Sequence, residues 1–371
     1  MAESYNFFEL STLININSYT KNKEGVDQNG KLMIKKLKEL GFEYKIFERE
    51  EIGNHIHFKS HKKEGKKILL LGHLDTVFPP MSFEEFREDD EWIYGPGVCD
   101  MKGGNFVALE ALRNIKKEIG EIYNIDFLLV SDEETGSDDS KEVTAKIAKD
   151  YDYCMVFEAA GKNDELVTER KGVATFYIDI KGKAAHAGNS YKEGINANLE
   201  AAEKILAITN LTDLEKGTTV NVGKIEGGIG ANTISPHAKL TVEIRYSSAK
   251  ERDRVLREFY DIVHTSTVLG CESILTGGIQ RDVMQSTPKQ EEFIKVIEKL
   301  TKTKTVTEKR GGVSDANIVA SVGTAVIDGF CPYGDGDHTI HERALKKSYI
   351  QRIDFVTKIL KGIITSKLDI I

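Results

Sequence analysis

The chain has 371 residues, of which 40% are hydrophobic and 30% are charged, a balance typical of globular proteins. The formal net charge of −8 argues against a nucleic-acid partner, which needs a basic surface, and against binding to an anionic membrane surface. The length is too great for one ordinary hydrophobic core and predicts two domains.

The first part of the chain alternates helical and strand patterns. A helix is predicted over residues 27–40, with Gly41 as its C-terminal stop. Continuous apolar runs predict buried strands over residues 66–72, 126–131 and 153–157. A second helix is predicted between the first two of these strands, over residues 102–119. Strands that alternate with helices predict an α/β domain with a doubly wound, mostly parallel sheet.

The pattern changes at about Gly172. Alternating strands and helices are predicted in the order β-α-β-β-α-β: strand 173–180, helix 195–208, strands 218–225 and 239–245, and helix 249–264. This order predicts a small α+β, ferredoxin-like domain with one open sheet face. The chain returns to α/β character near Thr287 and ends in a predicted helix over 345–364. We therefore expect a catalytic domain over 1–171 and 287–371, and an inserted lid or dimerisation domain over 172–286.

The chain shows no sign of export or membrane insertion. No stretch approaches the roughly 20 apolar residues that span a bilayer, and the N-terminal residues lack a basic segment followed by an apolar one. The four cysteines are far apart and form no Cys-x-x-Cys pair, which indicates reduced thiols. A cytoplasmic location and no membrane partner are the expectations.

Six side chains of the types found in metal sites lie in glycine-rich loops or directly after predicted strands. His73, Glu133, Glu134 and Glu158 come at the ends of predicted strands, and Asp100 and His338 lie in glycine-rich loops. Because open α/β sheets bind ligands at the carboxyl ends of their strands, these residues are expected to converge. Two imidazoles and three carboxylates can hold two divalent ions if one carboxylate bridges, which leaves Glu133 to move a proton.

Each of these residues also has a simpler interpretation. Asp100 precedes a helix and could be its N-cap. His338 could be a surface-loop histidine, and the spacing does not exclude His341 as the ligand in its place. Asp75 lies two residues after His73, so its carboxylate is expected to accept the second ring N–H of that histidine and fix its tautomer.

Taken together, the motifs resemble those of the M20 family of metallopeptidases. This group includes glutamate carboxypeptidase, acetylornithine deacetylase, succinyl-diaminopimelate desuccinylase and peptidase T. The resemblance covers nearly the whole chain and rests on residues 72–77, 97–104, 132–137 and 336–343.

The resemblance implies a role for each candidate in the catalytic domain. His73 and Glu158 would hold one ion and Glu134 and His338 the other, with Asp100 between them. Glu133 would be the general base, and the Asp100–Met101 peptide would be cis. Two divalent metal ions are expected as cofactors; zinc suits imidazole and carboxylate ligands, and cobalt or manganese would also fit.

The inserted domain carries further motifs of the same family. Residues 181–188 resemble the segment whose histidine, here His186, contacts the carbonyl oxygen of the scissile bond. Residues 227–236 match a loop whose asparagine, here Asn232, faces the substrate. Arg245 stands where relatives bind a substrate carboxylate, although an ordinary ion pair is an alternative. Gly311 and Gly312 match a loop at the floor of the substrate pocket. The resemblance also implies a homodimer formed through this domain.

The predicted activity is hydrolysis of an amide bond beside a free carboxylate by a glutamate-carboxypeptidase-like exopeptidase. Two alternatives keep the chemistry: an N-acyl amino acid deacylase, of the acetylornithine deacetylase or succinyl-diaminopimelate desuccinylase type, and a tripeptidase. The expected partner is thus a small peptide or an N-acyl amino acid. An inactive binding protein is an alternative from a different class, and the presence of every candidate ligand counts against it. A nucleotide-binding oxidoreductase is rejected because no Gly-x-Gly-x-x-Gly follows the first strand.

Overall fold

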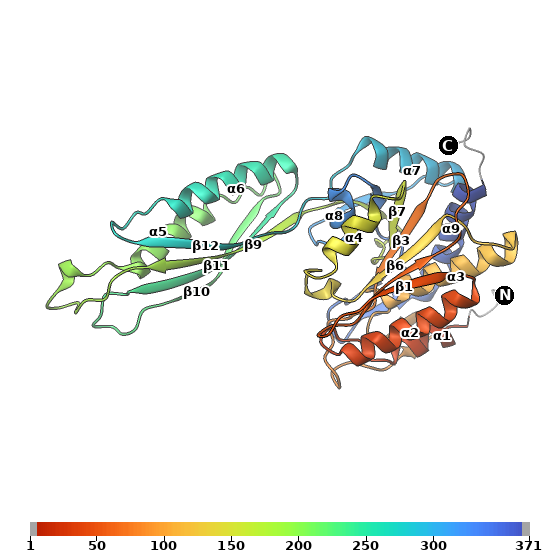
Figure 1. Ribbon diagram of the computed structural model, residues 1–371, viewed down its shortest axis with the longest axis horizontal. Helices are drawn as coiled ribbons and strands as arrows, with labels where there is room; N and C mark the ends of the chain where they lie inside the picture. The colour runs from red at the N-terminus through yellow and green to blue at the C-terminus, as the bar shows by residue number, and fades with distance from the viewer. Residues whose placement is uncertain (1–5, 366–371) are drawn as a thin grey trace. The chain divides into compact units, whose positions relative to one another are not determined.

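A computed structural model describes residues 6–365 of the chain (Figure 1). It divides into two compact units. The large unit comprises the described residues up to Glu169, Ser286–Arg310, and those from Ser314 onward, and the small unit comprises Arg170–Gln285 and Gly311–Val313.

The short segment Gly311–Val313 differs from the sequence-based expectation, which put it in the catalytic domain. It groups with the small unit because two arginines of that unit hold its backbone. Arg245 Nη1 donates to the carbonyl of Gly311 at 3.1 Å, and Arg170 Nη1 donates to that of Gly312 at 3.0 Å.

A six-stranded sheet lies at the centre of the large unit. Its strand order is β1-β2-β6-β3-β7-β14. The strands are β1 (Glu43–Phe47), β2 (His55–Lys59), β3 (Ile68–His73), β6 (Ile125–Val130), β7 (Tyr153–Val156) and β14 (Ala325–Ile327). The β6–β3, β3–β7 and β7–β14 pairs are parallel, and the β1–β2 and β2–β6 pairs are antiparallel. Every residue of β3 and β6 is buried, so both faces of the sheet are covered. The mostly parallel α/β sheet predicted from the sequence is confirmed.

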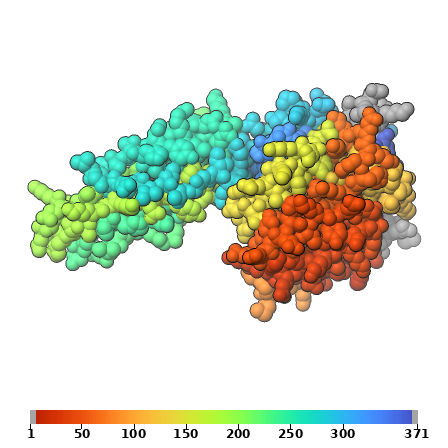
Figure 2. Space-filling view, viewed as in Figure 1, coloured from red at the N-terminus to blue at the C-terminus, as the bar shows by residue number. Residues whose placement is uncertain are grey.

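Seven helices of the described chain cover this sheet. They are α1 (Phe8–Ile14), α2 (Lys23–Glu39), α3 (Lys102–Ile119), α4 (Lys141–Ala148), α7 (Pro288–Thr301), α8 (Asp315–Ser321) and α9 (Lys346–Thr365). Helix α3 packs against α1 and α9, α7 packs against α9, and α4 packs against α8. The N-terminal residues, in red and orange, form much of the face of the large unit that is turned to the viewer (Figure 2).

Helix limits show where local sequence signals were sufficient. Helix α3 has the predicted bounds, and Gly41 follows α2 with the positive φ of a C-terminal stop, +94°. Helix α2 begins four residues earlier than predicted because the side chain of Asn22 caps it, accepting from the N–H of Gly25 at 3.4 Å.

Two small sheets of the large unit were not predicted. One has the order β15-β16-β5-β4, formed by Gly334–Asp335, Arg343–Leu345, Trp92–Tyr94 and Arg87–Glu88. The other pairs β8 (Leu166–Arg170) with β13 (Thr307–Arg310). Most of these strands have two to four residues, too few for a period-2 pattern to be read from the sequence.

The small unit is an antiparallel sheet backed by two helices. Its strands, in the order β10-β11-β9-β12, are β10 (Thr219–Gly227), β11 (His237–Tyr246), β9 (Gly172–Lys181) and β12 (Glu272–Arg281). The helices α5 (Ala197–Thr209) and α6 (Ala249–His264) pack against one another and on the sheet. Alternate residues of β9, such as Phe176 and Ile178, are buried, whereas Tyr177 is 42% exposed. The predicted β-α-β-β-α-β order with one open sheet face is confirmed.

Among residues 6–365, no helix combines the length and the apolar character that crossing a membrane requires.

Candidate metal centre

Three neighbouring parallel strands bring four candidate residues to one edge of the large unit's sheet. His73 is the last residue of β3. Glu133 and Glu134 follow β6 in a short 3-10 helix, Glu133–Thr135, and Glu158 comes two residues after β7. Because β6, β3 and β7 are adjacent, the ends of these strands lie together. Ligand-type atoms of His73, Glu133 and Glu158 all lie within 4.8 Å of one another.

Asp100 lies between the two histidines. Its Oδ1 is 3.1 Å from Nε2 of His73, and its Oδ2 is 3.2 Å from Nε2 of His338. Nε2 of His338 is also 3.1 Å from Oε2 of Glu134, and Nε2 of His73 is 3.8 Å from Oε1 of Glu158. Each oxygen of Asp100 therefore faces one histidine, and each histidine also pairs with a glutamate: His73 with Glu158 and His338 with Glu134.

The helix-cap interpretation of Asp100 is wrong. Met101 is the N-cap residue of α3, and no side chain caps that helix end. The Asp100–Met101 peptide is cis, which confirms the expectation drawn from the family resemblance.

A glycine of α3 allows the start of this helix to approach the end of β7. A Cβ atom on Gly104 would lie 2.1 Å from the carbonyl oxygen of Phe157, the residue before Glu158, which is closer than atoms can approach. The glycine thus keeps the Asp100 loop close to Glu158.

The separations within the cluster fit ligands that share a divalent ion. Ligand atoms about 2.0–2.1 Å from a zinc ion at tetrahedral angles lie about 3.3 Å from one another. The N···O separations of 3.1 and 3.2 Å around Asp100 are close to this value. His73, Asp100 and Glu134 also offer ligand atoms within 4.8 Å of one another. The donor set, imidazole nitrogens and carboxylate oxygens, suits a divalent metal.

The electrostatics of the cluster show strong coupling between its members. Hydrogen bonds to Asp100 and Glu134 raise the pKa of His338 to about 11. Burial opposes ionisation of Asp100, but hydrogen bonds with His338 and His73 outweigh it and keep the pKa of Asp100 below its ordinary value. Burial and then the charge of Asp100 raise the pKa of Glu134 and of Glu158 well above the usual range. Divalent cations would resolve this conflict, because they stabilise all the carboxylates in their charged form.

Asp75 contacts two parts of the cluster: the ring of His73 and the backbone of the two adjacent glutamates. Nδ1 of His73 lies 3.0 Å from the main-chain oxygen of Asp75 and 3.4 Å from its carboxylate Oδ1. The closer acceptor is therefore the main chain, not the carboxylate expected from the sequence. The carboxylate instead accepts from the N–H groups of Glu133 and Glu134, both at 3.3 Å, and from Oγ1 of Thr20 at 2.7 Å. Asp75 thus fixes both the ring of His73 and the backbone that carries the two glutamates.

A buried carboxylate that the sequence did not single out holds the Asp100 loop. Glu342 is fully buried and accepts three main-chain N–H groups, from Gly97 at 2.9 Å, Cys99 at 3.0 Å and Asp100 at 3.1 Å. Burial raises the pKa of Glu342 to about 7, against the lowering effect of these hydrogen bonds. The only signal in the sequence was its position four residues after His338, which does not reveal a partner more than 240 residues away.

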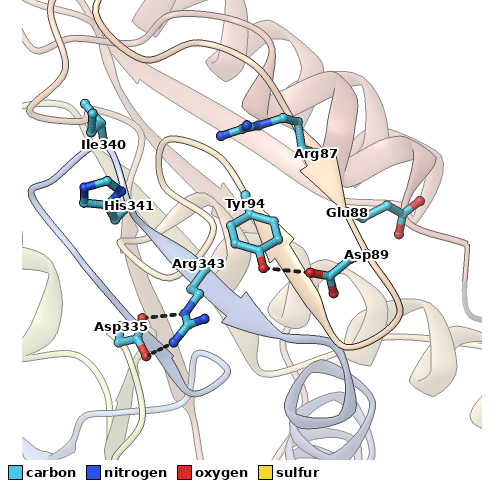
Figure 3. Close-up of a pocket in the computed structure, with 8 residues that line it drawn as sticks. All are labelled: Arg87, Glu88, Asp89, Tyr94, Asp335, Ile340, His341 and Arg343. Carbon is cyan, nitrogen blue, oxygen red and sulfur yellow. Dashed lines mark hydrogen bonds and ion pairs between the residues drawn. The ribbon is translucent and has the colours of Figure 1, made fainter.

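His338, not its rival His341, reaches the cluster. His338 has a φ of +61°, and the turn that carries it is closed by hydrogen bonds from the N–H and the hydroxyl of Thr339 to the carbonyl of Gly336 at 3.0 and 2.7 Å. His341 instead lines a cavity of about 500 Å³ in the large unit (Figure 3). In that cavity Arg343 pairs with Asp335 through two bonds, at 2.7 and 3.1 Å.

In the small unit, two of the expected substrate residues lie on paired loops. His186 and Thr233 form an isolated β-bridge, and the N–H of Ala187 donates to the main-chain oxygen of Asn232 at 2.9 Å. Nδ1 of His186 accepts from the N–H groups of Gly188 and Asn189, both at 3.1 Å. In the neutral ring the proton is therefore on Nε2, where it can be donated. Both His186 and Asn232 are exposed.

Arg245 has an ion pair within its own strand. Its Nε donates to Oε1 of Glu243 at 2.8 Å and its Nη2 to Oε2 at 3.3 Å, which is a bidentate pair. The alternative raised by the sequence, an ordinary ion pair, describes this contact. The side chain of Arg245 is 33% exposed, so part of the guanidinium faces solvent.

Gly311 and Gly312 contribute backbone carbonyls to the small unit. No atom lies within 4 Å of a Cβ built on Gly311, and for Gly312 the nearest is Nη1 of Arg170 at 4.0 Å. The described packing therefore does not itself require glycine at either position.

Comparisons with known proteins place most of the chain in one family. The model of Peptidase family M20/M25/M40 matches residues 69–362. Carboxypeptidase G2 from Pseudomonas sp. (strain RS-16) is 33% identical over 254 residues, which are 67% of this chain and 61% of that protein. The match therefore spans about three-fifths of this relative's length. A succinyl-diaminopimelate desuccinylase from Buchnera aphidicola is 25% identical over 84% of this chain and 86% of its own.

Solved structures share the fold. The crystal structure of a tripeptidase from Staphylococcus aureus has a TM-score of 0.80 at 24% identity, with 96% of this chain and 97% of that chain covered. Because the family model covers most of the sequence, including all six residues of the candidate cluster, the chain belongs to Peptidase family M20/M25/M40.

Proposed function

We propose that this protein hydrolyses an amide bond beside a free carboxylate, as a glutamate-carboxypeptidase-like exopeptidase. The observation that supports this most directly is the position of Asp100, whose two oxygens each face one histidine. A carboxylate shared in this way, with a further carboxylate beside it, is the arrangement that a two-metal hydrolase needs.

In this proposal His73 and Glu158 hold one ion, Glu134 and His338 hold the other, and Asp100 belongs to both. When bound, two such ions activate water at neutral pH and polarise the carbonyl group of the substrate. Zinc is the proposed metal because imidazole and carboxylate ligands suit it, and cobalt and manganese are the alternatives.

Glu133 is the proposed general base. It takes one proton from the attacking water while the oxygen of that water bonds to the carbonyl carbon. It then passes the proton to the amine nitrogen as the C–N bond breaks, which leaves a carboxylic acid and an amine. Glu133 lies in a short 3-10 helix, and its main-chain N–H donates to the carboxylate of Asp75. Both features support a fixed position for the carboxylate of Glu133.

Residues of the small unit would bind the substrate. The Nε2–H of His186 would donate to the carbonyl oxygen as it becomes negative, a contribution worth a few kcal/mol in enzymes generally. Arg245 would bind the free carboxylate of the substrate, for which it must share or exchange its pair with Glu243. Asn232 would orient the substrate, and the loop of Gly311 and Gly312 would offer main-chain groups at the pocket floor.

A second candidate keeps the site and changes the substrate. Deacylation of an N-acyl amino acid is favoured by the desuccinylase relative, which is matched over more of its length than carboxypeptidase G2. Tripeptidase activity is a further alternative; the tripeptidase structure from S. aureus, at 24% identity, shows only the fold.

The experiment is a substrate panel with zinc-loaded protein. The amount of amine released is compared for several classes of compound. These are dipeptides with C-terminal glutamate, aspartate or an apolar residue, tripeptides, and N-acetyl and N-succinyl amino acids. Preference for C-terminal glutamate compounds supports the carboxypeptidase assignment, and turnover confined to N-acyl amino acids replaces it with a deacylase. No turnover of any compound, with two metals bound, rejects the substrate class while leaving the metal centre in place.

Two further parts of the proposal concern the assembly and location of the protein. A homodimer through the small unit is supported by the open sheet face, where Tyr177 is 42% and Ile274 is 38% exposed. Light scattering after gel filtration tests it, and a monomer at micromolar concentration rejects it. A cytoplasmic location stays a prediction, which the four free and buried cysteines fit.

A further inference from the structure

A second cavity of the large unit lies apart from the candidate cluster. It has a volume of about 390 Å³ and is formed by three segments: the turn at Asn163 and Asp164, the loop after α7, and one side of α9. None of the candidate metal ligands lines it.

Arg352 of α9 is the unusual residue of this cavity. It is only 3% exposed, and its Nε and Nη2 atoms have no hydrogen-bond partner among residues 6–365. The nearest acid is Asp164, whose Oδ1 is 3.7 Å from Nε, which is too long for a hydrogen bond. The guanidinium carbon also lies 5.6 Å from the ring centre of Phe355, another residue of the cavity.

A second residue that lines the cavity also carries a polar atom without a partner. Oγ1 of Thr305 is buried and unbonded in the described chain, although the main-chain N–H of Thr305 donates to Oε1 of Glu298 at 2.9 Å. Buried polar groups nearly always have partners, and a buried charge without one costs several kcal/mol. Two guanidinium nitrogens and one hydroxyl, all on residues that line one cavity, are therefore donors that a ligand with acceptor atoms would satisfy.

We propose that this cavity binds a phosphate group, free or carried by a small molecule, with Arg352 as the anchor and Thr305 as a second donor. A guanidinium binds phosphate oxygens through two parallel N–H bonds, and the hydroxyl can donate to a third oxygen. Lys304 also lines the cavity and adds positive charge to it. The volume lies in the range of small-molecule pockets, so the phosphate can carry an organic group that packs on Phe355.

The acidic residues of the cavity oppose the binding of an anion. Asp354 is paired with Lys358, one turn along α9, which reduces its repulsion of an anion. Asp164 is 45% exposed on its side chain, and its Oδ1 accepts from the hydroxyl of Ser348 at 3.3 Å. The same oxygen is 3.7 Å from Nε of Arg352, a distant ion pair without a hydrogen bond. If Asp164 were the counterion of Arg352, its removal would weaken the structure. If a phosphate is the counterion, removal of Asp164 strengthens phosphate binding.

Calorimetric titration of the zinc-loaded full chain with inorganic phosphate tests the proposal. Arg352→Lys is expected to weaken binding by at least about tenfold, because lysine keeps the charge and loses the two-pronged contact. Thr305→Val, which is close in shape and leaves Arg352 untouched, is expected to weaken it about fivefold. Lys361→Gln is the matched control: it removes a charge from α9 outside the cavity and should change the affinity by less than about twofold. Phosphate can also bind at metal ions, so the readout is the difference between variants that keep every candidate ligand.

Two further titrations test the role of Asp164 and the nature of the ligand. Asp164→Asn is expected to tighten phosphate binding about threefold, since it removes a like charge from the cavity. Glycerol 3-phosphate in place of inorganic phosphate separates a carried phosphate from a free one, according to which binds more tightly. Equal phosphate affinity in wild type, Arg352→Lys and Thr305→Val overturns the proposal, as does an Asp164→Asn variant that loses thermal stability without gaining phosphate affinity.

Discussion

The candidate residues of the large unit and those of the small unit are held in different ways. In the large unit, His73, Asp100 and Glu158 are buried or nearly so, and Glu134 and His338 contact Asp100 or one another. In the small unit, His186 and Asn232 are exposed, and the described hydrogen bonds of their side chains stay within their own loops. Several carboxylates so close together repel one another, so a metal site must be built into the fold before the ions bind. Side chains that only orient a substrate can remain in solvent until it arrives.

The largest effect is expected for Asp100→Asn, which tests whether the large unit's cluster acts as one site. Asparagine has a single acceptor oxygen and directs an NH₂ group at one of the two histidines. Both ions should be lost on dialysis, and turnover should fall at least about 10⁴-fold. Metal analysis measures the first effect. Asp126→Asn, which is also buried but lies near the other end of β6, is the control and should keep its metals. Two ions retained in Asp100→Asn would remove Asp100 from the bridging position.

Two adjacent glutamates allow a sharper test within the cluster. Glu133→Gln should keep both ions and lose turnover by about 10³-fold, because the amide cannot accept the proton of water. Glu134→Gln should lose one ion. The pair is informative because Glu133 itself has an oxygen within 4.8 Å of ligand atoms of His73 and Glu158. If Glu133→Gln loses metal instead, this residue is a ligand and the base must be sought elsewhere.

In the small unit, His186→Ala should reduce kcat by about 10²-fold and leave the metal content unchanged. The loss arises because the Nε2–H donor disappears, whereas no candidate ligand is touched. His237→Ala is the matched control, since His237 is an exposed histidine of the same unit that pairs with Asp179 at 3.1 Å. Steady-state rates of the two variants distinguish the cases. A kcat for His186→Ala equal to that of the control would contradict the proposed role.

A smaller effect is expected for Glu342→Gln, which leaves every proposed ligand in place. The neutral amide can accept fewer of the three N–H bonds from Gly97, Cys99 and Asp100, so the Asp100 loop should loosen. Residues behind metal ligands typically contribute about 10- to 100-fold to metal affinity or activity. We expect a metal affinity lower by about 30-fold, measured by competition with a chelator. Unchanged affinity with reduced thermal stability would make Glu342 a purely structural residue.

The sequence predicted the architecture better than it predicted the connections around the cluster. The buried strands and α3 were found from apolar runs and helical periodicity, which are local signals. His73 and Glu158 could be placed because they follow such strands. Glu342 could not, since its partners lie in a loop more than 240 residues earlier, and no local pattern records that contact. The same reason explains why the carboxylate of Asp75 was assigned to the ring of His73, when the structure shows that it accepts from Thr20 and from the N–H groups of Glu133 and Glu134.

Arg245 gives the mildest prediction and the closest test of the contrast between the units. Its guanidinium already holds Glu243 through two bonds, so a substrate carboxylate must compete with an acid on the same strand. Arg245→Lys should raise KM about tenfold with little change in kcat, because it weakens substrate binding and leaves the metal centre alone. Glu243→Gln should act in the opposite direction and lower KM severalfold, since it frees the guanidinium from a charged partner. If both variants raise KM equally, the pair works as a structural unit and the free carboxylate is bound elsewhere. Opposite shifts in KM would instead show that Glu243 and the substrate compete for this half-buried arginine, in contrast to the fixed carboxylates of the large unit.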